Sequence, residues 1–477
     1  MTYETVVGLE VHVELATESK LFCACPSTFG CAENENCCEV CLGLPGSLPA
    51  VNRKAVEYAI RAGLALQCDI SEYLAFDRKN YFYPDLPKGY QISQLYHPLC
   101  RNGFLNITGK RIRIHEIHLE EDAGKLVHED GFTYVDYNRC GIPLIEIVTC
   151  ADFRSGIEAV DFLRKLRLLL RYLHVSDCKM EEGSMRADVN LSVRPVGEKV
   201  LGTRTEMRNL SSFRAVEQAI EAESKRQSAL LQAGGRVVQE TRRWDEKGAC
   251  SYPMRNKEEA RDYRYFPEPD IPIMRVDKEW VTNIRSKLPE LPEQKKERWQ
   301  EKYNLSDYDA DTLLNSEQMT RLFDQAALQS RYPKQIANWI LTEVLRLQNE
   351  GIKPTFSAVR FAELVGLAVE GKIGKDTARD LLQKLCEEEF DPAAYVAEHG
   401  LLLEKNTTLL EQAVKDVLTA FPQAVSDYHS GKERAAGFLT GQAMKKLRGQ
   451  ADSRQVSELV KKHLQNSEKK LVFLQVL

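Results

Sequence analysis

Three polar side chains near the N-terminus have the types and spacing of a metal site. The segment Val7–Glu14 alternates apolar and polar residues, so a strand here places Glu10, His12 and Glu14 on one face. Side chains two apart on a strand point the same way, about 6.6–6.8 Å apart. Carboxylates and an imidazole in one row suit a hard cation such as Mg²⁺. A solvated polar face is the alternative, and this segment alone does not exclude it.

Four further segments with strand-like patterns carry acids. Glu146 is the one polar residue of the apolar run Leu144–Val148, and a buried carboxylate needs a partner or a metal. The others are Ala187–Val193 with Asp188, Thr203–Arg208 with Glu206, and His118–Lys125 with three consecutive acids. Five such segments indicate a shared site, although each also fits a separate structural role.

Six of the 13 cysteines lie between residues 23 and 41. Cys23 and Cys25 form one close pair, and Cys38 and Cys41 form another. Two close pairs on two loops are typical of a structural Zn²⁺ site with thiolate ligands. Cys31 and Cys37 are either substitute ligands or spare thiols, and a coincidental group of cytosolic cysteines is the alternative to a metal site.

Two loops have the composition of a polar pocket lining, and several familiar motifs are missing. Lys79–Gln94 and Asp262–Asp270 are dense in Tyr, Lys and Gln, but ordinary structural loops have this composition too. The sequence lacks a G-x-x-x-x-G-K-[ST] phosphate loop, a G-x-G-x-x-G fingerprint and a G-x-S-x-G elbow. A chain of this kind that handles ATP must use a metal and scattered side chains.

The elements that must position these residues form an α+β pattern up to about residue 290. Short alternating segments separated by Gly and Pro predict strands. A capping box at Ser155 and Glu158 predicts a helix that ends near Leu173. A second helix is expected from about Ser212 to Ala233. The proline-marked segment Arg285–Tyr303 predicts a domain boundary.

Beyond that boundary the pattern is helical. We expect a large N-terminal α+β domain with a mixed or antiparallel sheet at 1–293, an all-α domain at 294–405 and a small all-α tail at 406–477. The tail holds 11 Lys and Arg against 7 Asp and Glu, whereas the rest of the chain holds 54 against 63. A basic tail on an acidic body fits a protein that docks a polyanion with one end.

The composition of the 477 residues is that of an ordinary globular protein, with 43% hydrophobic and 28% charged residues. No apolar run approaches the roughly 18 residues that span a bilayer. The N-terminus shows no secretory signal pattern. We therefore expect a cytoplasmic protein with no membrane association.

Taken together, these segments resemble the family of aspartyl/glutamyl-tRNA amidotransferase B subunits. The likeness covers nearly the whole chain, and its motifs are long and specific. They are Glu4–Val13, the Cys pairs leading into Cys41–Gly46, Tyr81–Gln94, His118–Lys125, Gly141–Val148, Lys179–Ser184, Asp262–Asp270 and Gly437–Met444.

The resemblance implies a cradle-shaped N-terminal catalytic domain, a helical domain and a helical tail that helps bind tRNA. It also implies the reaction. ATP phosphorylates the side-chain carboxylate of Glu-tRNA(Gln) or Asp-tRNA(Asn), and ammonia displaces the phosphate to give the amide. Glutamine hydrolysis belongs to a separate amidase (A) subunit, and a small C subunit completes a heterotrimer.

The resemblance also implies roles for individual residues. His12, Glu121 and Glu146 would hold one Mg²⁺, with Glu10, Asp188 and Glu206 as further ligands or as ligands of a second site. Lys79 would line the ammonia route or the acceptor pocket. Cys23, Cys25, Cys38 and Cys41 would bind a structural Zn²⁺.

Two other functions compete with the amidotransferase interpretation. A non-catalytic, zinc-containing RNA-binding or assembly subunit accounts for the cysteines and the basic tail, but it leaves the strand-borne acids unexplained. A stand-alone ligase that uses free ammonia would need no partner.

Overall fold

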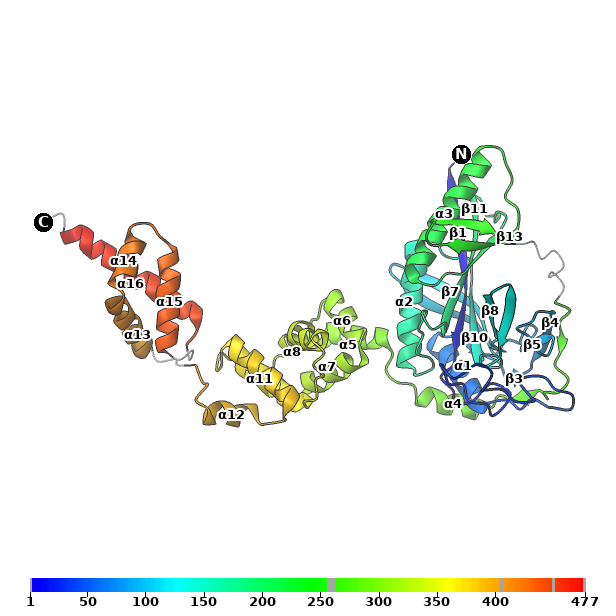
Figure 1. Cartoon of the computed structure of the whole chain (residues 1–477), viewed down its shortest axis with the longest axis horizontal. Helices are drawn as coiled ribbons and strands as arrows, with labels where there is room; N and C mark the ends of the chain where they lie inside the picture. The colour runs from blue at the N-terminus through cyan, green and yellow to red at the C-terminus, as the bar shows by residue number, and fades with distance from the viewer. Residues whose placement is uncertain (1, 255–262, 404–406, 448–450, 475–477) are drawn as a thin grey trace. The chain divides into compact units, whose positions relative to one another are not determined.

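The computed structural model describes residues 2–254, 263–403, 407–447 and 451–474 (Figure 1). The chain forms two compact units, Met1–Pro292 and Glu293–Leu477, here called the sheet unit and the helical unit. The division between them lies one residue from the boundary expected at 293/294. The second expected boundary, at 405/406, and Asp262 lie outside the described residues.

The sheet unit is built on one nine-stranded sheet. Its strands are β1 (Tyr3–Glu14), β2 (Asp69–Ile70), β6 (Cys100–Ile107), β7 (Lys110–Glu121), β10 (Pro143–Thr149), β11 (Met185–Pro195), β12 (Thr205–Arg208), β13 (Glu240–Asp245) and β14 (Cys250–Pro253). They lie in the order β14–β13–β12–β11–β1–β10–β7–β6–β2, so β1 is central. All neighbours are antiparallel except β12 and β13, which are parallel. The sheet is therefore mixed, which agrees with the predicted α+β domain.

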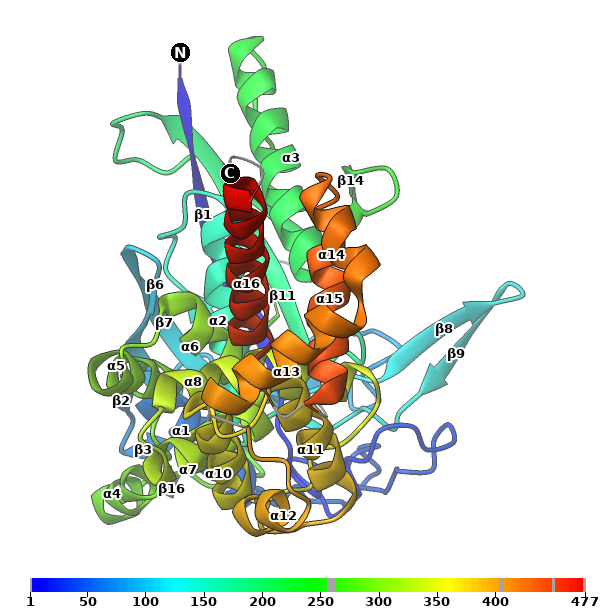
Figure 2. The ribbon, with the colours of Figure 1, turned by 90° about the vertical axis from the view of Figure 1, so that its left-hand side faces the viewer.

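Three small sheets accompany the large one. They are β4 (Asp77–Asn80) between β5 (Tyr90–Ser93) and β15 (Phe266–Pro267), β3 (Tyr73–Leu74) with β16 (Met274–Arg275), and the hairpin β8 (Lys125–Glu129) and β9 (Phe132–Asp136). The β8–β9 hairpin extends away from the large sheet (Figure 2). The loop sequence Lys79–Gln94, which gave no clear strand pattern, thus contributes β5 and the end of β4.

The two faces of the large sheet differ in polarity. On β1 the side chains of Val7, Leu9, Val11 and Val13 are buried. They share one hydrophobic core with residues of α1 (Arg53–Ala65), α2 (Gly156–Tyr172), α3 (Phe213–Gln232) and α4 (Lys278–Ser286). Because strand side chains alternate, the intervening polar residues of β1 face away from this core.

Local sequence explains where α2 begins and how closely it packs. The Ser155 side chain accepts a hydrogen bond from the Glu158 backbone N–H, and the Glu158 carboxylate accepts one from the Arg154 backbone N–H at 2.8 Å. Gly156 follows Ser155. A Cβ atom at Gly156 would lie 2.8 Å from the backbone oxygen of Glu217 in α3. A glycine at this position therefore lets the start of α2 approach the α3 backbone.

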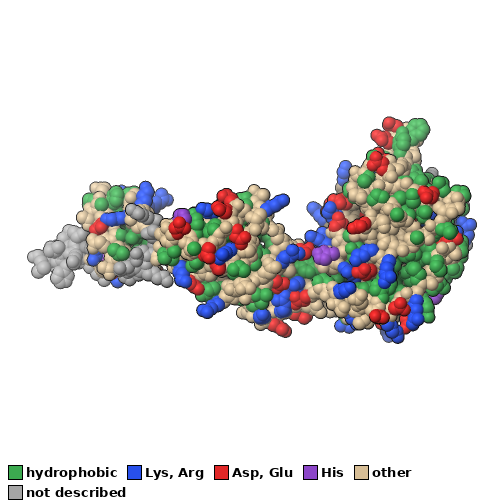
Figure 3. Space-filling model, turned by 90° about the horizontal axis from the view of Figure 1, so that it is seen from below, with side chains coloured by type: hydrophobic (Ala, Val, Ile, Leu, Met, Phe, Trp, Pro, Cys, Tyr) green, Lys and Arg blue, Asp and Glu red, His purple; other side chains and the backbone are tan. Residues whose placement is uncertain are grey.

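The described part of the helical unit contains helices and no strand. The elements are α5 (Pro292–Tyr303), α6 (Asp307–Leu314), α7 (Glu317–Gln329), α8 (Pro333–Trp339), the π-helical segment η2 (Ile340–Val344), α9 (Leu345–Asn349), α10 (Ala358–Val369), α11 (Lys375–Glu387), α12 (Pro392–Glu398), α13 (Thr407–Ala420), α14 (Pro422–His429), α15 (Arg434–Lys446) and α16 (Ser453–Leu474). Helices α13, α15 and α16 share a separate hydrophobic cluster that includes Val414, Leu439 and Val460. Lys and Arg side chains are interspersed with Asp and Glu over the visible surface (Figure 3). Among the described helices, none combines the length and hydropathy needed to cross a membrane.

Candidate metal centres

The pairing of β1 with its two neighbours brings the predicted acids together. His12 lies opposite Glu146 of β10, and Glu146 lies opposite His118 of β7. On the other side of β1, Glu10 lies opposite Asp188 of β11. Directly paired residues of antiparallel strands point to the same face, with Cβ atoms about 4.5–5.5 Å apart. The sheet register thus assembles one polar surface from segments far apart in the sequence.

His12, Glu120 and Glu146 form the first cluster. One ligand atom from each lies within 4.8 Å of the others. His12 Nε2 lies 3.4 Å from Glu120 Oε1 and 3.4 Å from Glu146 Oε2. His118 adjoins the cluster, with its Nε2 at 3.0 Å from Glu146 Oε2. An imidazole nitrogen and two carboxylates at this separation can share one divalent cation.

The electrostatics of the first cluster favour positive charge. Burial lowers the pKa of His12, but the carboxylates of Glu146 and Glu120 outweigh burial and raise this pKa to about 9. Burial raises the pKa of Glu146, yet the imidazoles of His118 and His12 hold it well below its usual range. A buried site that stabilises cations this strongly is suited to a metal ion.

Glu10, Asp188 and Glu206 form the second cluster, and their ligand atoms also lie within 4.8 Å of one another. Burial raises the pKa of Glu10, and repulsion from Glu146 and Glu206 raises it further. Asn190 Nδ2 donates to Glu10 Oε1 at 2.8 Å, and Arg208 pairs with Glu206. Three crowded carboxylates with one nearby arginine offer an all-oxygen site of the kind that Mg²⁺ prefers.

The prediction that Glu121 joins His12 and Glu146 differs from the structure, where Glu120 takes that place. On β7, Glu120 is two residues from His118 and points to the same face, whereas Glu121 points to the opposite face. The Glu121 carboxylate accepts hydrogen bonds from Lys88 and from the Ile92 backbone N–H. Among three consecutive acids, only the register decides which one reaches the cluster.

Glu14, the third residue of the N-terminal row, joins neither cluster among the described residues. It lies beside Asp122: burial raises the pKa of Glu14, and the Asp122 carboxylate adds to the rise, to about 8. The sequence analysis also missed Glu120 and His118 as members of the first cluster. Their spacing, two residues apart on one strand, repeats the Glu10–His12 spacing and was the available signal.

Lys79, on β4, lies close to the first cluster. Its Nζ sits 4.9 Å from the ring centroid of Tyr263. Burial lowers the pKa of Lys79, but the carboxylates of Glu120 and Glu146 and the neighbouring tyrosines raise it overall. The structure thus adds a firmly charged ammonium to the polar surface, beside an aromatic wall.

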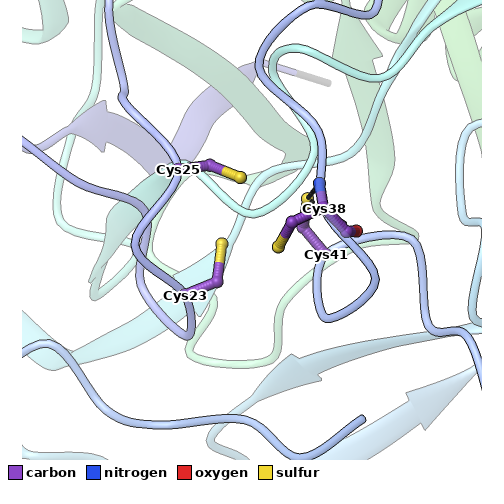
Figure 4. Close-up of side chains that lie close together, drawn as sticks. All are labelled: Cys23, Cys25, Cys38 and Cys41. Atoms are coloured by element: carbon purple, nitrogen blue, oxygen red, sulfur yellow. Dashed lines mark hydrogen bonds between the residues drawn. The ribbon is translucent and has the colours of Figure 1, made fainter.

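The four predicted cysteines come together from two loops (Figure 4). The Sγ atoms of Cys23, Cys25, Cys38 and Cys41 all lie within 4.8 Å of one another. The sulfur atoms of a tetrahedral zinc site with Zn–S bonds of about 2.3 Å are about 3.8 Å apart, so the donor set fits Zn²⁺. Cys31 and Cys37 are not members of this group. We call these four residues the cysteine cluster.

One thiol of the cysteine cluster, that of Cys41, has a lowered pKa. The hydrogen bond from Cys23 lowers the pKa of Cys41, burial raises it, and the Cys38 backbone and Lys20 lower it again, to about 4. The thiolate is the form that binds metals. The Cys38 backbone N–H lies 3.2 Å from Cys41 Sγ, which holds this sulfur in place.

Comparison with family models identifies two matching regions. Residues 5–282 match the GatB/GatE catalytic domain, and residues 321–464 match the GatB domain. The first match contains both acidic clusters, Lys79 and the cysteine cluster. The second match lies within the helical unit.

Curated proteins align with nearly the whole chain. The B subunit of the aspartyl/glutamyl-tRNA(Asn/Gln) amidotransferase of Lachnoclostridium phytofermentans is 49% identical over 472 residues, covering 97% of this chain and 99% of the relative. The protein of the same name from Agathobacter rectalis is 51% identical over 468 residues, covering 96% and 98%. That from Caldicellulosiruptor bescii is 50% identical over 479 residues, covering 98% and 100%.

Proposed function

The chain belongs to the family of aspartyl/glutamyl-tRNA(Asn/Gln) amidotransferase B subunits, and from this we propose how its clusters serve the reaction. It is a subunit of a glutamine-dependent carbon–nitrogen ligase that acts on aminoacyl-tRNA. The arrangement of two acidic clusters on neighbouring strands of one sheet carries the mechanistic part of this proposal.

The reaction has two chemical steps. A carboxylate is a poor electrophile, so the side chain of Glu-tRNA(Gln) or Asp-tRNA(Asn) first attacks the γ-phosphorus of ATP, and ADP leaves. Ammonia then attacks the carbonyl carbon of the acyl phosphate, and phosphate leaves. The product is Gln-tRNA(Gln) or Asn-tRNA(Asn).

The two acidic clusters are the proposed Mg²⁺ sites. His12, Glu120 and Glu146 would hold one ion, and Glu10, Asp188 and Glu206 a second. Bound Mg²⁺ neutralises phosphate charge and orients the reacting groups, because phosphoryl transfer depends on positioning and electrostatics. Glu10 and His12, on one strand, fix the spacing between the two sets of ligands.

Lys79 is proposed to bind the anionic part of the substrates. Its ammonium lies near the first cluster, where the γ-phosphate or the acceptor carboxylate must arrive for transfer. A fixed cation at this position stabilises charge that develops during phosphoryl transfer. Tyr263 lies beside this ammonium and adds a cation–π attraction that helps to hold it in place.

The cysteine cluster is proposed to hold a structural Zn²⁺. Four thiolates complete a tetrahedral shell, which leaves no open position for substrate, and closed shells of this kind serve folding. The two loops that carry the cysteines contain few regular elements, so a metal would replace the missing backbone ladder. We propose no part for this metal in the chemistry.

The partners follow from the subunit assignment. An amidase subunit would supply ammonia from glutamine, and a small third subunit would complete the heterotrimer. We propose that the tail at 406–477, with its excess of basic residues, contacts tRNA phosphates. We propose a cytoplasmic location, which is consistent with these partners.

The two competing functions are disfavoured to different degrees. The match of residues 5–282 to a catalytic domain favours an enzyme subunit over a non-catalytic RNA-binding or assembly module. A stand-alone ligase differs from a subunit because it needs no partner. Glutamine-dependent product made by this chain alone would contradict the subunit assignment.

The decisive experiment supplies the purified chain with Mg-ATP, Glu-tRNA(Gln) and ammonium chloride, without glutamine, and measures Gln-tRNA. We expect product from the wild type and a large loss with Glu146→Gln. Glu4→Gln is the matched control, because Glu4 lies on the same face of β1 but pairs with Arg194. If no product and no tRNA-dependent ATP turnover appear even with the amidase and small subunits added, the catalytic proposal fails.

A further inference from the structure

Lys20 is a fully buried cation beside the cysteine cluster. Its side chain has 0% relative exposure. The ammonium donates to three acceptors: the Asn36 carbonyl at 2.6 Å, the Tyr137 carbonyl at 3.4 Å and Cys41 Sγ at 3.6 Å. Every N–H of the ammonium thus has a partner, and one of these partners is a proposed metal ligand.

The charge of Lys20 needs an anion nearby. A buried ammonium without a counter-charge strongly destabilises a fold. Within the described ranges, no carboxylate forms an ion pair with Lys20. Glu121 lines the same 210 Å³ pocket as Lys20, but it pairs with Lys88. The ionisable group that accepts a hydrogen bond from Lys20 is Cys41, and the thiols of Cys37 and Cys140 lie nearby.

A zinc site with four thiolate ligands has a negative charge that needs to be offset. Four thiolates around one Zn²⁺ carry a net charge of about −2, which is costly to bury. An ammonium that donates to one of the sulfur atoms offsets part of this charge. Groups that bond to metal ligands in this way orient the ligands and tune metal affinity.

We propose that Lys20 is a positioning residue of the cysteine cluster, whose ammonium holds Cys41 and offsets the charge of the thiolate-bound metal. The inference rests on the proposed Zn²⁺ site and extends it to a residue outside the four ligands. Lys20 precedes Cys23 by three residues and contacts the loop of the second cysteine pair, so one side chain joins both halves of the site.

The cysteine loop offers a matched control for a purely mechanical role. Asn138 ties the same loop without a charge: its Oδ1 accepts from the Asn36 backbone N–H at 2.8 Å, and its Nδ2 donates to the Ala32 carbonyl at 2.6 Å. Asn138→Ala therefore loosens the loop and leaves the ammonium in place. Lys20→Met and Lys20→Gln remove the charge, and the Gln variant keeps an N–H donor.

The experiment measures Zn²⁺ affinity of the zinc-free full chain by competition with a chromophoric chelator. Lys20→Met and Lys20→Gln should weaken binding by roughly 10–100-fold, the range seen when partners of metal ligands are lost. Asn138→Ala should change it far less. In Co²⁺-loaded protein, loss of the ammonium should shift the sulfur-to-cobalt charge-transfer band to lower energy, because the thiolate electrons are no longer stabilised.

Each other outcome overturns a distinct statement. If the wild type binds no Zn²⁺, the zinc proposal itself fails. If the wild type binds Zn²⁺ and the Lys20 variants match it in affinity and cobalt spectrum, only the Lys20 inference fails. If Asn138→Ala equals Lys20→Met, loop anchoring explains the effect and charge does not. If both uncharged variants fail to fold with or without Zn²⁺, Lys20 serves the fold and the inference is overturned.

Discussion

At the scale of single residues, Glu120 and Glu121 are chain neighbours in opposite environments. Glu120 faces His12 and Glu146 on the polar surface of the sheet. Glu121 faces Lys88, and both side chains of that pair are almost fully buried, at 3% and 7% exposure. One carboxylate therefore serves the candidate metal centre, whereas the other neutralises a buried ammonium.

Replacing each acid by glutamine should separate the two roles. Glu120→Gln removes a proposed ligand, so Mg²⁺-dependent ATP turnover should fall by roughly 100-fold or more. This loss is larger than the roughly 10–100-fold loss expected when a residue that only bonds to a ligand is removed. Glu121→Gln leaves Lys88 unpaired and should lower the free energy of unfolding by about 3–5 kcal/mol. Magnesium titrations of turnover and urea unfolding measure the two effects. Loss of metal dependence in Glu121→Gln with unchanged stability would contradict the assignment.

Asp324 of α7 gives a pH-dependent contribution to the stability of the helical unit. Burial raises the pKa of Asp324, but hydrogen bonds from Lys295, Arg298 and Trp299 outweigh burial and lower it overall. A carboxyl with a depressed pKa stabilises the fold above its unfolded pKa of about 3.9, and this stability is lost as the pH falls through the folded value.

The stability gap between the wild type and Asp324→Asn should therefore be constant from pH 7 to about 5 and should close below about 4. Thermal unfolding across this pH range measures it. Asp309→Asn, at a partly buried position in the first turn of α6, is the control and should show a smaller gap. A gap that widens toward acid pH would reverse the sign argued here.

At the scale of elements, the packing of α2 on α3 depends on one glycine. A Cβ at Gly156 would meet the backbone of Glu217 at 2.8–2.9 Å, and backbone atoms cannot rotate away as a side chain can. Gly366, inside α10, has nothing within 4 Å of the position that a Cβ would take, so it is free to accept a methyl group.

Two alanine substitutions should therefore have opposite signs. Gly156→Ala forces α2 and α3 apart and should cost about 1–3 kcal/mol of stability. Gly366→Ala should add about 0.5–1 kcal/mol, because alanine is the better helix former. Denaturant unfolding of the full chain, followed separately for its two units, checks both. Stabilisation by Gly156→Ala would mean that the α2–α3 contact yields more easily than the geometry indicates.

The elements also show where sequence analysis succeeds and where it stops. Alternation on β1, β10 and β11 and the caps of α2 and α3 are local patterns, and the structure has the expected elements there. The two cysteine pairs, also local, lie together in space. Register is not local. It depends on which strands pair across the sheet, so the choice of Glu120 over Glu121 and the separation of Glu14 from the clusters required the structure.

At the scale of the whole molecule, charge is distributed unevenly. The tail at 406–477 is basic, although Lys446 and Lys432 are each paired with an aspartate on a neighbouring element or turn. Nucleic-acid binding by such a surface releases counterions and weakens with salt. The helical periodicity of the sequence predicts the second, all-helical part of the chain. It does not predict which lysines remain available for phosphate, because that depends on the ion pairs of the folded structure.

Removing the tail should change the salt dependence of tRNA binding. A chain that ends at residue 403 should bind tRNA more weakly than the full chain, and the plot of log affinity against log salt concentration should be less steep. Filter binding at several salt concentrations measures both. An unchanged slope would show that the tail makes no phosphate contacts.

The position of β1 in the middle of the sheet has a consequence for biosynthesis. Among the strands of this sheet β1 is translated before its neighbours β10 and β11, which follow much later, and Glu10 meets Asn190 across 180 residues of chain. The nascent strand therefore stays unpaired until β10 has emerged, and its second neighbour β11 follows later still. Pairings of such high contact order form slowly and expose strand edges meanwhile. The ligands of the two acidic clusters are all present only once the segment through Glu206 has been translated.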